Sequence, residues 1–173
     1  MPLKAGPNGT MRAYSSTNGQ YVSMGLDMLL SIKGNSKKPL TKQEKRCNRY
    51  LNLLEKAEKS RDPLVYDVFK FIESRFPYCV EHVNEKVYDK NISSTREMDI
   101  ITHKHIIEIK SGERPGALMQ GLAQKDYANK HNKKYIMYAP NILKNTRIVY
   151  ESKGLIVCKN KEELFQEMRK WTE

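Results

Sequence analysis

Apolar residues recur at helical spacing from about residue 40 onward. Thr41 and Glu44 have the three-residue spacing of a capping box, and Ala57 closes the apolar stripe that follows them. Asp62 is a typical N-cap residue followed by proline at the first helical position, so a second helix is predicted from there to Pro77. Its apolar stripe consists of Leu64, Val65, Val68, Phe69 and Ile72.

The rest of the chain alternates between strand-like and helix-like patterns. Strands are predicted over 79–88, 95–102 and 105–110. A long helix follows over 115–131, with Leu118, Leu122 and Ala123 facing inward. The remaining elements are a buried strand at 135–139, a helix or turn at 141–153, a strand at 154–158 and a helix at 161–171. This order, α-βββ-α-β with further elements after it, predicts an α/β fold with a mixed sheet flanked by helices.

Residues 1–38 differ from this pattern, because glycine, proline, serine and asparagine recur throughout them. We predict a linker or accessory N-terminal segment over 1–38 and a folded domain over 39–173. No window approaches the roughly 18 apolar residues of a membrane-spanning helix, so no membrane span is expected. The first residues lack the apolar stretch of a secretory signal, and no signal peptide is expected on this chain.

The composition adds a large positive charge. The 173 residues include 31 lysines and arginines against 20 acidic residues, a net charge of +11. This surplus favours a polyanionic partner, nucleic acid first and an anionic membrane surface second, although a soluble basic domain has the same composition. Cys47, Cys79 and Cys158 are far apart and odd in number, so reduced structural thiols are expected rather than disulfides or a metal knuckle.

One stretch carries a pattern with chemical meaning. Two strand-like runs flank residues 103–104, which predicts an antiparallel hairpin with its turn at that dipeptide. In this register Thr102 pairs with His105, and Asp99 lies directly opposite Glu108. Residues that are directly opposite have Cβ atoms about 4.5–5.5 Å apart.

The hairpin predicts a cation site. Strand side chains alternate faces, so Lys110 shares a face with Glu108 and Glu97 shares one with Asp99. Paired carboxylates repel unless a positive charge lies between them, and Mg²⁺ binds one or two carboxylates together with waters and phosphate oxygens. Such a metal lowers the pKa of a bound water, and Lys110 can contact that water or the scissile phosphate. The alternative is a solvent-facing hairpin with a Glu97–Lys110 pair, but isoleucines flank both acids.

Asp99 followed by Glu108-Ile109-Lys110, a D-x₈-ExK pattern, resembles the signature of the PD-(D/E)XK (restriction-endonuclease-like) nuclease superfamily. The element order over residues 62–171 is similar to that of the same fold. The resemblance implies a metal-dependent endonuclease in which Asp99 and Glu108 bind Mg²⁺ or Mn²⁺, joined by the carbonyl of Ile109. It also implies that Lys110 positions or activates the water.

The resemblance implies two further site residues on helices. Many members carry a glutamine on the helix after the lysine strand, and Gln120 is our choice over Gln124, one turn later. Members also carry an acid on the helix before the first strand. Asp67 is the choice for this additional metal-site acid, and Glu73 is the other acid there.

Basic residues predict a nucleic-acid contact near this site. Arg114 lies in the glycine-containing turn 111–116 that leads into the long helix, where a phosphate can approach. With Lys125, Lys130, Lys133 and Lys134 it is expected to form a basic band beside the site. A solvated helix face has the same pattern. His103 and His105, at the hairpin turn, are expected to face solvent or phosphate rather than a metal.

A second resemblance concerns the front segment. Residues 9–14 (GTMRAY) followed by 18–22 (NGQYV) resemble the linker that precedes toxin domains in bacterial polymorphic toxins. A C-terminal nuclease behind such a linker is typical of contact-dependent inhibition toxins. The resemblance implies action in the cytoplasm of a target cell and a cognate acidic immunity protein.

The sequence therefore predicts an endonuclease toxin that hydrolyses phosphodiester bonds, with DNA as the preferred substrate and tRNA as the other candidate. Two alternatives stay open. One is a non-catalytic nucleic-acid-binding module on the nuclease scaffold, and the other is a nuclease of the resolvase or repair type.

Overall fold

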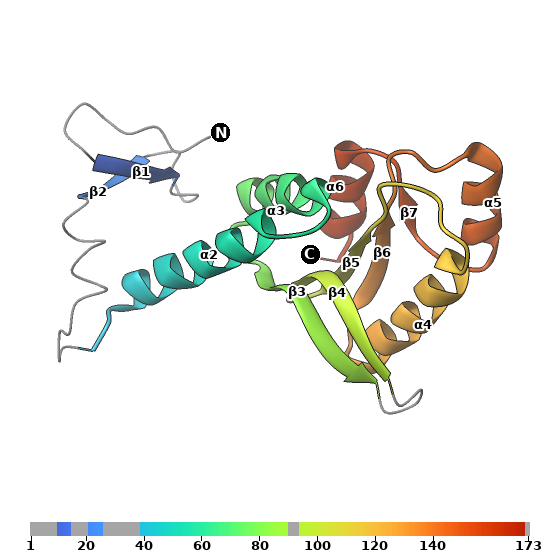
Figure 1. Cartoon of the computed structure of the whole chain (residues 1–173). Coiled ribbons are helices and arrows are strands. Elements are labelled where there is room, and N and C mark those ends of the chain that lie inside the picture. The colour runs from blue at the N-terminus through green and yellow to red at the C-terminus, as the bar shows by residue number, and fades with distance from the viewer. Residues whose placement is uncertain (1–9, 15–20, 26–38, 90–93, 172–173) are drawn as a thin grey trace. The chain divides into compact units, whose positions relative to one another are not determined.

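The structure, a computed structural model, describes residues 10–14, 21–25, 39–89 and 94–171 (Figure 1). The chain divides into two compact units, residues 1–47 and 48–173. In the first unit, β1 (Thr10–Tyr14) and β2 (Tyr21–Gly25) form an antiparallel hairpin. The division falls within helix α2 (Lys42–Glu58), whereas the sequence predicts a boundary at residues 38–39.

Helices α2 and α3 begin at the predicted caps. The Thr41 N–H donates to Glu44 Oε2 at 2.7 Å and the Glu44 N–H donates to Thr41 Oγ1 at 3.2 Å, which confirms the capping box of α2. Helix α3 (Pro63–Arg75) begins after Asp62, whose carboxylate accepts from the Leu64 N–H at 2.9 Å. Side-chain capping satisfies amide groups that have no partner within the helix.

A five-stranded mixed sheet forms the centre of the second unit. Its spatial order is β3 (Val80–Asp89), β4 (Ser94–Thr102), β5 (His105–Ile109), β6 (Lys134–Tyr138) and β7 (Val157–Cys158). The β3–β4 and β4–β5 pairs are antiparallel, whereas the β5–β6 and β6–β7 pairs are parallel. Parallel neighbours need crossover connections, which contain α4 (Ala117–Lys130) and α5 (Lys144–Ser152). Helix α6 (Lys161–Arg169) follows β7. These elements confirm the predicted α/β fold with a mixed sheet and flanking helices.

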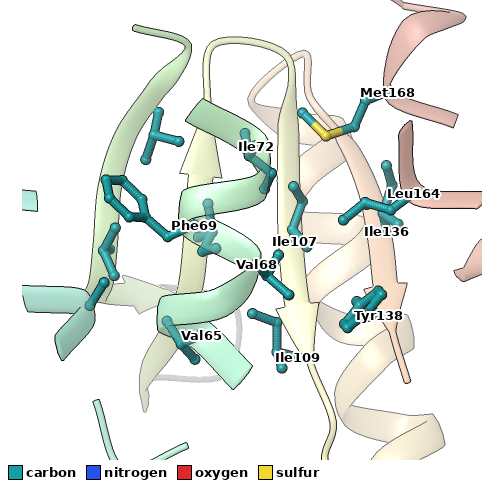
Figure 2. Packing of buried hydrophobic residues seen from close by; sticks show 14 of the residues in the cluster. Val65, Val68, Phe69, Ile72, Ile107, Ile109, Ile136, Tyr138, Leu164 and Met168 are labelled. Atoms are coloured by element: carbon teal, nitrogen blue, oxygen red, sulfur yellow. The ribbon is translucent and has the colours of Figure 1, made fainter. Parts of the chain in front are cut away.

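Helices cover both faces of the sheet. On one face, apolar side chains of α3 and α6 pack against β5 and β6 (Figure 2). This cluster includes Val65, Val68, Phe69, Ile72, Ile107, Ile109, Ile136, Tyr138, Leu164 and Met168. On the other face, α4 packs over a second cluster that includes Met98, Ile101, Ile106, Ala128, Tyr135, Met137, Leu155 and Val157. Ile107 and Ile109 thus face α3, and Glu108 between them faces α4.

The buried stripe of α4 differs from the prediction. The residues buried along it are Ala117, Gly121, Gln124 and Ala128, whereas the predicted Leu118, Leu122 and Ala123 are only half-buried. A Cβ added to Gly121 would lie 3.1 Å from both Met137 Cε and Leu155 Cδ1, which is a tight contact. Small residues therefore let the helix approach the sheet closely, and this brings its glutamines within reach of β5.

We expect Ile107→Ala to lower the free energy of unfolding by about 2–5 kcal/mol, because the truncation leaves a cavity between α3 and the central strand. Ile107 is fully buried, whereas Ile148 on α5 is 53% exposed. The matched variant Ile148→Ala should therefore change stability by less than about 0.5 kcal/mol. Urea denaturation of both variants measures the difference, and equal losses would contradict this description of the core.

Candidate active site at the end of the β4–β5 hairpin

The β4–β5 hairpin has the predicted register. Ile100 pairs with Ile107 and Ile101 pairs with Ile106, with the turn at residues 103–104. This is the register that places Asp99 opposite Glu108. The hairpin geometry was predictable because a two-residue turn between two strand-like runs fixes the pairing.

Beyond the Ile100–Ile107 pair, a side-chain hydrogen bond instead of a backbone one joins β4 to β5. Asp99 Oδ2 accepts a hydrogen bond from the backbone N–H of Ile109 at 2.7 Å. This bond fixes the Asp99 carboxylate beside the last residue of β5. Glu108, one residue earlier on β5, is only 3% exposed. The two acids thus lie on neighbouring strands at one end of the hairpin.

Lys110 and Gln120 complete a hydrogen-bonded triangle with Glu108. Lys110 Nζ donates to Glu108 Oε1 at 2.6 Å and to Gln120 Oε1 at 3.1 Å. Gln120 Nε2 donates to the same Glu108 Oε1 at 3.3 Å. Both Lys110 and Glu108 are largely shielded from solvent, with side chains 16% and 4% exposed. The structure therefore brings together all four residues predicted for the centre of the site: Asp99, Glu108, Lys110 and Gln120.

The two carboxylates disfavour each other's ionisation. Burial, followed by the negative charge of Glu108, raises the pKa of Asp99 to about 7, against the opposing effects of the Ile109 N–H and Lys110. Burial also raises the pKa of Glu108, although Lys110 and Gln124 act to lower it. The charge of Glu97 raises the pKa of both groups. Without a further cation, the site therefore favours a state in which the acids are not all ionised.

The roles of two residues in the site, Gln124 and Tyr135, were not predicted from the sequence. Gln124 is fully buried and donates to Glu108 Oε2 at 2.8 Å, and the Tyr135 hydroxyl donates to Gln124 Oε1 at 3.2 Å. The sequence signal for Gln124 is its four-residue spacing from Gln120, together with the small residues Ala117 and Gly121 on the same helix face. Tyr135 carries no comparable signal, because its position opposite α4 depends on how β6 joins the sheet.

The additional acids lie elsewhere. Asp67 is on α3, which covers the opposite face of the sheet, and pairs with Lys161 at 2.7 Å. Glu73 accepts hydrogen bonds from the backbone N–H groups of Tyr78 and Val80 at 2.9 and 3.1 Å, so it stabilises the turn after α3. Neither contact joins these acids to Asp99 or Glu108.

The predicted basic band is not a single surface beside the site. Arg114 is exposed in the turn between β5 and α4, close in the chain to Gln120. Lys125 Nζ instead lies near Gly154, where an added Cβ would be 2.8 Å away. Lys133 pairs with Glu81 at 2.7 Å, and Lys134 lies over the Trp171 ring. On the neighbouring strand β6, Lys134 lies opposite His105 at the start of β5, whereas Asp99 and Glu108 lie near the end of β5. The prediction of a single basic band beside the site was therefore wrong.

His105 also departs from expectation, because it is 1% exposed and not solvent-facing. Its Nε2 has no hydrogen-bond partner within the described part of the chain. Burial and the nearby Lys133 and Lys104 lower the pKa of His105 to about 4. The imidazole is therefore neutral near pH 7, in the interior beneath the hairpin turn. His103 remains exposed, as predicted.

The donor set of the site has the chemistry of a hard-cation site. Across residues 39–89 and 94–171, no group of three or more histidine, cysteine, aspartate or glutamate side chains is arranged to hold a metal. Asp99 and Glu108 nevertheless supply two carboxylates, each with a raised pKa that a divalent cation would counter. Mg²⁺ commonly uses only one or two protein carboxylates and completes its coordination with water and substrate phosphate. The residues present therefore fit such an ion.

Comparisons with known proteins find no match: no family model, no curated protein and no solved structure is significantly similar to this chain. Among the helices of the described residues, none combines the length and apolar character needed to span a membrane.

We expect Asp99→Asn to stabilise the protein at pH 8 in EDTA. The folded state raises the pKa of Asp99 from 3.8 to about 7, so the ionised carboxylate destabilises the fold above pH 7. Asparagine keeps an acceptor for the Ile109 N–H and carries no charge. The gain should be roughly 1–3 kcal/mol at pH 8 and should shrink as the pH falls from 7 towards 4.

Urea denaturation at several pH values measures this gain. Asp126→Asn, on the exposed side of α4, is the matched control and should show no comparable pH-dependent gain. If wild type and Asp99→Asn are equally stable at every pH, Asp99 carries no repelled charge and the electrostatic description fails.

Proposed function

We propose that this chain is a metal-dependent endonuclease of the PD-(D/E)XK type, acting on the phosphodiester bonds of nucleic acid. The observation that carries the proposal is the cluster at the end of β5. There, two shielded carboxylates on neighbouring strands meet the amine of Lys110, 2.6 Å from Glu108. Perturbed, clustered titratable groups of this kind are typical of catalytic sites.

Asp99 and Glu108 are the residues that would hold Mg²⁺ or Mn²⁺. When bound, such an ion polarises the phosphate and makes water more acidic. The Ile109 N–H fixes the orientation of Asp99, so that its other oxygen has a defined direction. Gln120 bonds both Lys110 and Glu108 and thereby keeps the lysine amine at the carboxylate. In this proposal, the Lys110 ammonium orients the attacking water or neutralises a phosphate oxygen.

The net charge of +11 supports a polyanionic substrate. Arg114 lies in the exposed turn before α4, and the Gly116 carbonyl of that turn accepts from the Gln120 N–H. We assign Arg114 a phosphate contact beside the cluster. For Lys125, the position near Gly154 favours a contact away from the reacting phosphate.

The front segment supports a toxin role for this nuclease. Arg12 and Tyr14 of the linker-like motif lie on β1, and Tyr21 lies on β2 directly opposite Tyr14. Gly9 and residues 18–20 of the motif lie outside the described residues. The proposal includes action in the cytoplasm of a target bacterium and a cognate acidic immunity protein that neutralises the basic domain.

Lys110→Met should reduce nucleic-acid cleavage in Mg²⁺ by at least about 100-fold, because methionine keeps the length of the side chain and removes the amine. The assay measures plasmid nicking by the full chain, with and without EDTA. Lys59→Met is the control, since Lys59 is 73% exposed in a surface pair with Glu55. The control should cleave at the wild-type rate. Full activity of Lys110→Met, or of wild type in EDTA, would refute the assignment.

DNA is the preferred substrate in this proposal. Supercoiled plasmid and total tRNA, incubated side by side at equal nucleotide concentration, should therefore show faster cleavage of the plasmid. Cleavage of tRNA alone would reverse the choice of substrate while leaving the site assignment intact.

One observation favours a second candidate, a non-catalytic nucleic-acid-binding module. Lys110 already neutralises Glu108 at 2.6 Å, so the cluster has a cation of its own. This candidate predicts binding that weakens steeply with salt and does not change with EDTA, and no cleavage in either condition.

A further inference from the structure

Gln124 makes an unusual set of contacts for a fully buried side chain. Its Nε2 donates to Glu108 Oε2 at 2.8 Å and to the backbone carbonyl of Glu97 at 3.4 Å. Its Oε1 accepts from the Tyr135 hydroxyl at 3.2 Å. The amide therefore joins three strands, because Glu97 is on β4, Glu108 on β5 and Tyr135 on β6.

Donor and acceptor chemistry gives this amide a single orientation. A carboxylate and a backbone carbonyl only accept hydrogen bonds, so both hydrogens of Nε2 must point at Glu108 and Glu97. Oε1 then faces Tyr135, whose hydroxyl must be the donor. A flipped amide would place Oε1 against the Glu97 carbonyl and Glu108 Oε2, which are both acceptors. These buried acceptors would then lack a hydrogen-bond donor, which is costly in an apolar interior.

The surrounding packing is built to admit this chain of bonds. A Cβ added to Gly121, one turn before Gln124, would lie 3.3 Å from the Tyr135 hydroxyl oxygen. The layer around it is otherwise apolar, including Met98, Ile106 and Met137. An apolar side chain at position 124 would match that layer, but it would remove the hydrogen bonds that Gln124 makes with Glu108 Oε2 and the Tyr135 hydroxyl. Gln124 and Tyr135 therefore have a role beyond packing in the core.

We propose that Tyr135 and Gln124 form a positioning relay that holds Glu108 Oε2 in place, so that Glu108 Oε1 stays directed at Lys110 and the metal side of the site. Neither residue touches substrate, and both act through Glu108. The inference rests on the proposed function for its metal, but the relay itself is a property of the protein alone. Groups behind a metal ligand commonly change metal affinity by about 10–100-fold when they are removed.

The first test follows the amide directly, without metal or substrate. In ¹⁵N–¹H spectra of the full chain, the Gln124 side-chain NH₂ is the pair of signals assigned through its correlations to the Cβ and Cγ of the same residue. We expect slow solvent exchange of this pair in wild type and at least about 10-fold faster exchange in Tyr135→Phe, which removes only the hydroxyl. Tyr138→Phe is the control, because Tyr138 is buried on the same strand but faces α3.

The second test measures Mn²⁺ binding by calorimetry. Gln124→Met should bind Mn²⁺ at least about 10-fold more weakly than wild type, and Tyr135→Phe should fall between them, whereas Tyr138→Phe should match wild type. Thermal unfolding of each variant confirms that it is folded. Tyr135→Phe keeps the test decisive if Gln124→Met does not fold.

The outcomes separate the relay from the proposed function. Unchanged amide exchange in Tyr135→Phe overturns the relay, as does Mn²⁺ affinity within twofold of wild type in both variants. If wild type binds no Mn²⁺, the metal-dependent function fails, and the amide exchange alone decides the relay. Faster exchange in Tyr135→Phe but not in Tyr138→Phe, together with weaker Mn²⁺ binding, supports both.

Discussion

The burial of Glu108 is the constraint on which the site depends. Its neighbours Ile107 and Ile109 fix one face of β5 against α3, so strand alternation directs Glu108 into the opposite layer beneath α4. A buried carboxylate is costly unless every oxygen has a partner. Three side chains meet this requirement: Gln124 bonds one oxygen, while Lys110 and Gln120 bond the other. The chemistry of the site is thus a consequence of strand geometry.

The close approach of α4 follows from the same constraint. Glutamine side chains reach a strand only when the helix lies near it, and Gly121 permits this because its missing Cβ avoids Met137 and Leu155. The helix therefore presents Gln120 and Gln124, four residues apart, to one carboxylate. A larger apolar face on α4 would stabilise the fold more. The helix instead makes polar contacts at one end of the sheet. Departures of this kind from ideal packing are typical of functional sites.

The sequence predicts what depends on local geometry and misses what depends on the placement of distant elements. Turn position and strand alternation were enough to place Asp99, Glu108 and Lys110 together. By contrast, Gln124 and Tyr135 meet only because of the rotation of α4 and the pairing of β6 with β5. Lys133 and Lys134 follow the long helix closely in sequence, yet a parallel β6 must begin beside the start of β5, away from the acids. Asp67 was misplaced for the same reason, since periodicity does not tell which face of the sheet a helix covers.

In the proposed function, the Asp99 and Glu108 carboxylates tolerate each other because they share a divalent cation. Anomalous diffraction from crystals soaked in MnCl₂ tests it most directly, since it locates the ion without reference to any activity. A shared ion should give an anomalous peak between the two carboxylates, within coordination distance of an oxygen of each. Peaks confined to other parts of the protein, or no ordered Mn²⁺ at all, with Lys110 still bonded to Glu108, would contradict it.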